Sequence, residues 1–99
     1  MNAPVLVDGN PIHYVGLPVH LREGMRRYLE ERVRPGNTLM AILCNDLMGA
    51  VLRISIENMV DLPEIIRWVH WNSPHDCHGS RERVTAWLAK RDEITTENI

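Results

Sequence analysis

The sequence predicts an all-α fold, a compact bundle of about four helices packed around a central apolar helix. The segment 38–52 is apolar at nearly every position and rich in Leu, Met and Ala, which favour helices over strands. On both sides of this segment, apolar residues recur at helical spacing. A helix that is apolar on all sides is buried on all sides, so we place the helix 38–52 at the centre of the bundle.

The other helices are predicted from their start and stop signals, within a helical domain that spans residues 18–91. The first helix has a charged face and ends at Pro35-Gly36. We expect a kink or a short helical turn before Pro63, and a flexible tail over residues 92–99. The start signals are Pro18 for the first helix, Asn37 or Thr38 for the central one, Asp61-Leu62-Pro63-Glu64 for the third, which ends near Trp71, and Ser80 for the last.

Residues 1–17 are expected to form an extended N-terminal arm that is loosely attached to the helices. A short hairpin is the alternative, because Asp8-Gly9 suits a turn with positive φ and apolar residues flank it on both sides. An isolated hairpin is barely stable, so it would have to lie on the helices or on a second subunit.

Composition and charge limit the classes of function. The chain has 99 residues, enough for one domain, and a net charge of −2, which argues against a general nucleic-acid-binding protein. We see no apolar targeting segment near Met1, and the segment 38–52 is too short to span a membrane. With only Cys44 and Cys77, we expect a cytoplasmic protein without a membrane or nucleic-acid partner.

Several short motifs follow one another in a fixed order along the helical part of the chain. They resemble, in one register over about residues 18–90, a family of short bacteriophage and prophage proteins. That family has no established activity, so the resemblance implies no catalytic or binding residues. It implies an accessory phage protein that acts in the host cytoplasm. The motifs are Pro18-x-His20, Arg27-Tyr28-Leu29-Glu30, Pro35-Gly36, Ala41-Ile42-Leu43-x-Asn45-Asp46-Leu47, Cys77-His78-Gly79-Ser80 and Val84-Thr85-Ala86-Trp87-Leu88.

One polar segment contains side chains of the types that bind zinc. His75-Asp76-Cys77-His78 follows His70 by about one helical turn. A zinc site usually needs four ligands in two separated pairs, whereas these lie together in one segment. We therefore expect a polar loop, no metal and no cofactor.

Asn45 and Asp46 are the only strongly polar residues inside the apolar segment. A buried carboxylate is costly unless it is paired, so we expect Asp46 to bind a backbone amide or an arginine such as Arg27 or Arg53. This structural role is the favoured interpretation. The alternative is that the pair faces a pocket or a partner.

No set of residues predicts catalysis. Cys44 is expected in the core, and Cys77 is only a chain neighbour of His78, so neither thiol has an evident activating base. A glycine-rich phosphate loop is absent. We therefore expect that the protein is not an enzyme.

The leading hypothesis is a phage accessory protein that binds and modulates a host protein, including a component of antiviral defence. Trp68 and Trp71 compete for a small core, so one of them, beside Arg67 and His75, is expected to contact the partner. Surplus apolar side chains on the central helix also predict a homodimer.

A small-ligand protein that sequesters a nucleotide signal is the alternative. Arg22 and Arg26 would bind phosphate, and Tyr14 and His20 would stack on the base or add polar contacts. A DNA-binding helix-turn-helix protein is less favoured, because the central helix is too apolar to lie in a groove.

Overall fold

The structure of the protein, a computed structural model, describes residues 5–97 and the side chains of residues 6–91. The described chain is mostly helical, which confirms the all-α class. It contains six α-helices rather than about four. In chain order the elements are β1 (Val5–Val7), β2 (Asn10–Ile12), η1 (Tyr14–Gly16), α1 (Val19–Glu31), α2 (Asn37–Leu43), α3 (Leu47–Arg53), α4 (Ile56–Met59), α5 (Leu62–Asn72), η2 (His75–Cys77) and α6 (Arg81–Glu97).

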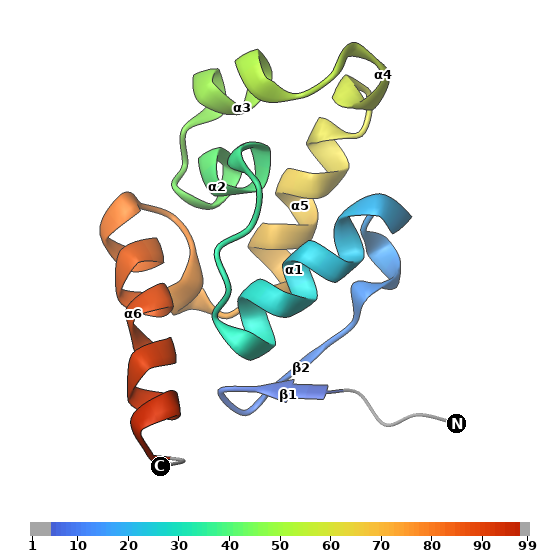
Figure 1. The fold of residues 1–99 in the computed structure, drawn as a ribbon. Helices are drawn as coiled ribbons and strands as arrows, with labels where there is room; N and C mark the ends of the chain where they lie inside the picture. Colours follow the sequence, from blue (N-terminus) through green and yellow to red (C-terminus); the bar gives the residue numbers. More distant parts are fainter. Residues whose placement is uncertain (1–4, 98–99) are drawn as a thin grey trace.

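The helices surround one main core (Figure 1). In this view α1, α2 and α5 lie in the middle, α3 and α4 lie above them, α6 runs along one side, and the β1–β2 hairpin lies below α1. Hydrogen bonds from aromatic side chains connect distant elements: the Tyr28 hydroxyl donates to the carbonyl of Cys77 at 2.6 Å, and Trp87 Nε1 donates to the carbonyl of Tyr28 at 2.9 Å. These two bonds fasten α6 and the loop before it onto α1.

The central helix predicted over residues 38–52 is wrong, because the chain forms two short helices there, α2 and α3. Asn45 has a φ of 64°, a left-handed conformation that ends α2 and that Asn tolerates better than most residues. Asp46 then caps α3, since its Oδ1 accepts a hydrogen bond of 2.9 Å from the amide of Gly49. The polar pair is therefore an exposed helix boundary rather than a buried feature.

The large apolar side chains of α2 and α3 differ in burial. Leu43 in α2 has none of its surface exposed, as predicted, whereas Leu47 in α3 is 57% exposed. The expectation that the whole segment 38–52 is buried is thus correct for α2 and wrong for most large side chains of α3.

The N-terminal hairpin forms, and it is part of the core. Val5 pairs with Ile12 across an Asp8-Gly9 turn in which both residues have positive φ, 50° and 82°. Val7 and Ile12 are buried with the helices. The loosely attached arm is therefore wrong for residues 5–17, because apolar side chains on one face of the hairpin are removed from water.

The other helices lie close to their predicted positions. The helix predicted to start at 61 is α5, and α4 is the short helical turn expected before Pro63. The last helix, α6, begins after Ser80 as predicted and continues to Glu97, so residues 92–97 of the expected tail are helical. Residues 98–99 lie outside the described chain.

Candidate functional site

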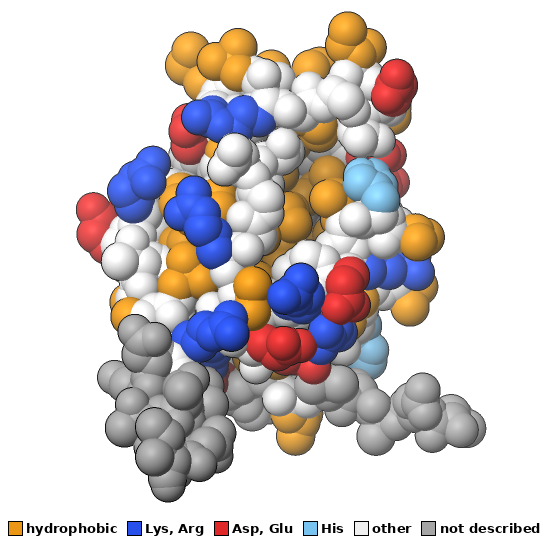
Figure 2. Space-filling model, viewed as in Figure 1, with side chains coloured by type: hydrophobic (Ala, Val, Ile, Leu, Met, Phe, Trp, Pro, Cys, Tyr) orange, Lys and Arg blue, Asp and Glu red, His pale blue; other side chains and the backbone are white. Residues whose placement is uncertain are grey.

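Several exposed large apolar side chains of the described chain lie along α3 and α4. We call this surface the α3–α4 face and define it by Leu47, Met48, Leu52, Ile56 and Val60, which are 57–90% exposed. Figure 2 shows hydrophobic side chains along this edge of the molecule, above the other helices. Such a concentration of large apolar side chains in water is typical of surfaces that bind another molecule.

The α3–α4 face arises because α3 packs through its small residues. Gly49 and Ala50 are buried, and Ala50 contacts Ala41 and Leu62 in a second, smaller core cluster. A side chain at position 49 would collide with Asp46 and with Arg53 Nη1. The large side chains of this helix consequently point outward, which is the reverse of an ordinary amphipathic surface helix.

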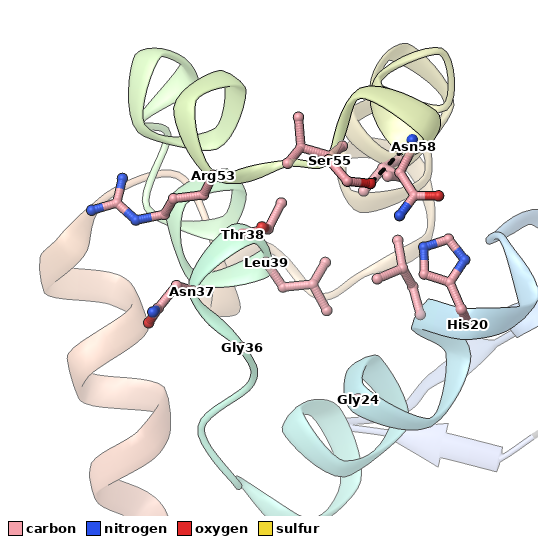
Figure 3. Close-up of a pocket in the computed structure, with 12 residues that line it drawn as sticks. His20, Gly24, Gly36, Asn37, Thr38, Leu39, Arg53, Ser55 and Asn58 are labelled. Atoms are coloured by element: carbon pink, nitrogen blue, oxygen red, sulfur yellow. Dashed lines mark hydrogen bonds between the residues drawn. The ribbon is translucent and has the colours of Figure 1, made fainter.

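A pocket of about 410 Å³ lies between α1, α2, α4 and α5. Its apolar wall includes Leu39 and Ile65. Its polar groups come from His20, Asn37, Thr38, Arg53, Ser55 and Asn58. In Figure 3 the Asn58 side chain, from α4, points toward His20 of α1. The Ser55 hydroxyl accepts a hydrogen bond of 3.3 Å from the backbone amide of Asn58, which fixes the start of α4 at the pocket edge.

A second, smaller pocket of about 150 Å³ is polar and is lined by three arginines. We call it the arginine pocket and define it by Arg34, Arg53 and Arg81, with Asn37 and Asp46 beside them. In Figure 3 the side chains of Arg53 and Asn37 point away from His20 and toward α6. Figure 2 shows Lys and Arg side chains gathered in this region, below α3.

Only one of the two tryptophans predicted to contact a partner is exposed to solvent. Trp68 is buried, its ring lies 5.8 Å from that of Tyr14, and its Nε1 donates to the carbonyl of His13 at 2.9 Å. Trp71 is 78% exposed and lies edge-on to His70. Trp68 is therefore a core residue, and Trp71 is the tryptophan that remains exposed.

Arg67 and His75, the other two predicted contact residues, are both exposed to solvent. The ring of His75 stacks on that of His78, with the two centroids 6.2 Å apart. Neither residue belongs to the α3–α4 face or lines the arginine pocket.

The predicted phosphate-binding arginines are engaged elsewhere. Arg22 donates to the carbonyl of Leu17 from Nε and to that of Val15 from Nη2, both at 2.9 Å. Arg26 forms ion pairs of 2.6 Å with Glu23 and 2.9 Å with Glu31. Both guanidinium groups therefore already have hydrogen-bond or ion-pair partners within the chain.

Tyr14 and His20, the two residues predicted to stack on the base, have different surroundings. The Tyr14 hydroxyl donates to Glu30 at 2.8 Å, and burial together with this carboxylate raises the pKa of Tyr14. His20 lines the larger pocket without the other three residues. Tyr14 and Arg26 lie together, because both contact Glu30, and Arg22 binds the carbonyl of Val15, the residue after Tyr14. His20 does not join them.

In the loop that contains histidine and cysteine, removal from solvent shifts the pKa values of Cys77 and His78. Burial raises the pKa of the Cys77 thiol to about 11, so this thiol is protonated at neutral pH. Burial also lowers the pKa of His78. Within residues 6–91, no three His, Cys, Asp or Glu side chains converge in a way that could hold a metal ion.

The sequence predicted surplus apolar side chains in the segment 38–52 but not the two-helix arrangement of the α3–α4 face, and it gave no prediction of the arginine pocket. The available signal for the face was Asp46-x-x-Gly49, a helix start inside the apolar segment. The arginine pocket gave no local signal, since its three arginines lie at positions 34, 53 and 81.

No protein-family model matches the chain, and no curated protein or solved structure is significantly similar to it. Across the described helices, none has the length and apolar character needed to cross a membrane.

Proposed function

We propose that the protein is a non-catalytic binding module that docks on another protein through the α3–α4 face. The observation that supports this most strongly is the exposure of Leu52 and Ile56, 79% and 90%, on two consecutive helices. Large apolar side chains gain free energy when a partner removes them from water, about 25 cal/mol per Å² of apolar area. Burial of this face would therefore favour association.

The charges around the face indicate the chemistry of the partner. Arg53 is the last residue of α3 and lines the arginine pocket, so the apolar face continues directly into a basic area. A protein surface with an apolar centre and acidic residues at one side would complement it. An anionic membrane fits less well, because Asp46, Glu57 and Asp61 lie at the ends of α3 and α4.

The resemblance to phage proteins supports a host protein as the partner. We infer an accessory phage protein in the host cytoplasm that modulates this target by occupying its surface, and a component of antiviral defence is the kind of target we propose. Such a role requires binding and no chemistry by the chain itself.

A matched pair of variants tests this proposal. Leu52→Asp places a charge in the face, and Val19→Asp places one at an equally exposed position, 74% against 79%, outside it. A host protein retained by the wild type should be purified, and its affinity measured by calorimetry. We expect Leu52→Asp to weaken binding at least tenfold and Val19→Asp to leave it unchanged. Equal binding by both variants would contradict the proposal.

Light scattering of the isolated chain identifies a different occupant of the same face. A mass of twice 11.4 kDa that Leu52→Asp reduces to the monomer would assign the α3–α4 face to a second copy, as the predicted homodimer requires. Binding to anionic vesicles but to no protein would assign it to a membrane. Either result would reject a host protein as the occupant.

The pocket of about 410 Å³ supports a second candidate, a small-ligand protein, because its volume is in the usual range for ligand sites. Most of its polar groups are neutral hydroxyl, amide and imidazole groups, and the side chain of Arg53, the charged residue in its lining, points away from His20 (Figure 3). This lining suits an uncharged polar ligand better than a nucleotide. Native mass spectrometry of protein purified from host cells would detect it. A bound mass lost in Gly24→Leu, which fills the pocket, but kept in Arg27→Leu would support this function.

A further inference from the structure

We infer that the arginine pocket binds a carboxylate group, supplied by an acidic side chain of the docked partner. Three arginines from distant parts of the chain line this pocket: Arg34 from the segment between α1 and α2, Arg53 from the end of α3, and Arg81 from the start of α6. The proposal deepens the proposed function, since it assigns a chemistry to the partner beside the α3–α4 face.

The fold brings these segments together through backbone contacts. The amide of Gly79 donates to the carbonyl of Leu43 at 2.8 Å, which holds the start of α6 against the end of α2. The amide of Met40 donates to the carbonyl of Gly36 at 2.9 Å, which fixes the first turn of α2 next to Arg34. The arginine pocket is therefore a property of the tertiary structure rather than of any one helix.

The three arginines lack the acidic partners that other arginines of the chain have. Arg26 has carboxylates of Glu23 and Glu31 within 2.9 Å. In residues 6–91, by contrast, no carboxylate oxygen lies within the 4.0 Å ion-pair distance of Arg34, Arg53 or Arg81. The only side-chain hydrogen bond among the three that the described chain provides is from Arg53 Nη1 to the carbonyl of Gly49, at 3.1 Å.

Three like charges with only Asp46 beside them raise the free energy of the free protein, and an anion in the pocket would lower it. Guanidinium groups bind carboxylates with two parallel hydrogen bonds, and several donors can share one anion. The net charge of −2 makes this local excess of positive charge more distinctive, because no acidic side chain of residues 6–91 is in ion-pair contact with the three arginines.

The size and the remaining wall of the pocket favour a carboxylate over a larger or more highly charged anion. About 150 Å³ is too small for a nucleotide. Asp46 also lines the pocket, and although its Oδ1 accepts from Gly49, its negative charge repels a phosphate dianion more than a singly charged carboxylate. A Glu or Asp side chain of a protein docked on the neighbouring α3–α4 face has the required charge and size.

Nuclear magnetic resonance of the ¹⁵N-labelled chain tests the pocket with a blocked hexaglutamate peptide as the probe. We expect saturable shifts of the guanidinium and amide signals of Arg34, Arg53 and Arg81 at low salt. Arg81→Gln should weaken binding at least fivefold, and Arg27→Gln, an exposed arginine on α1, should not. Higher salt should weaken binding by the wild type, since exposed charges are screened.

Three results of this titration would overturn the inference. These are shifts that do not saturate, equal binding by Arg81→Gln and the wild type, or the same shifts with inorganic phosphate at lower concentration than the peptide. Hexaglutamate has no apolar side chain to bury, so this experiment does not depend on the α3–α4 face. A partner whose binding requires Leu52 but not Arg81 would reject the carboxylate site and leave the proposed function standing.

Discussion

The guanidinium carbon of Arg32 lies 3.3 Å from the centroid of the Trp87 ring. Arg32 is only 9% exposed, and its Nη2 lies 3.4 Å from Asp8 in the hairpin turn. The residue also ends α1 in the left-handed conformation, φ 60°, where glycine is the usual choice. The contacts of the Arg32 side chain offset the backbone strain at this position, because the side chain covers Trp87 and connects the hairpin, α1 and α6.

Variants at position 32 separate the side-chain contact from the backbone strain. Arg32→Ala keeps a Cβ in the left-handed conformation and loses the contact with Trp87, whereas Arg32→Gly loses the contact but relieves the strain. We expect both to be less stable than the wild type, and Arg32→Ala to be the worse by about 1 kcal/mol. Urea titrations measure the difference. Equal stability of the two variants would contradict the left-handed assignment.

Leu43 and Leu47 are one helical turn apart in sequence and differ in burial, 0% against 57% exposed. Leu43→Ala should cost about 2–5 kcal/mol, because it leaves a cavity in the core. Leu47→Ala should change the free energy of unfolding by less than about 0.5 kcal/mol, as surface substitutions usually do. Chemical denaturation of both variants decides between the two-helix structure and a continuous buried helix, which would make both substitutions costly.

The cap of α3 is tested by two changes at Asp46. Asp46→Ala removes the acceptor for the Gly49 amide and should destabilise the domain by about 0.5–2 kcal/mol. Asp46→Asn keeps an oxygen in the same place and should lose much less. Thermal melts compare them, and a similar loss for both would mean that the charge, rather than the cap, stabilises α3.

The lowered pKa of His78 predicts that the free energy of unfolding falls in mild acid. Burial, and then the positive charges of His75, His70 and Arg83, lower its pKa in the folded chain from the ordinary value of 6.5. The unfolded chain therefore takes up a proton first as the pH falls below 6.5. The contribution to stability is present above that pH and is lost as the pH falls through the folded pKa.

The free energy of unfolding between pH 7.5 and 5.5 should therefore fall less in His78→Gln than in the wild type. His13→Gln, at an exposed position, is the control and should follow the wild type. An unchanged pH dependence in His78→Gln would contradict the lowered pKa.

The parts of the fold that the sequence predicted are those with local boundary signals. Pro18, the Asp61–Glu64 segment and Ser80 mark α1, α5 and α6 because caps and prolines act within one helical turn. The helix boundary inside the segment 38–52 is less clearly marked. A continuous apolar pattern also does not show which side of a helix faces inward. Only the left-handed Asn45 and the small residues at 49 and 50 turn the apolar side chains of α3 to the surface.

The candidate site was predicted less well than the fold, for a different reason. Of the residues proposed for partner contact, Trp71, Arg67 and His75 are exposed, but the α3–α4 face and the arginine pocket depend on contacts between segments far apart in sequence. Spacing along the chain carries no information about such contacts unless a known motif accompanies them.

The packing of α3 through Gly49 and Ala50 also bears on how the protein can change over generations. Two small residues tie the helix to the core, and Leu47, Met48 and Leu52 contribute little to folding because they are mostly exposed. Substitutions at these outward positions are therefore not filtered by the need to fold. The α3–α4 face, proposed here as the binding surface, can therefore diverge rapidly while the scaffold beneath it stays intact.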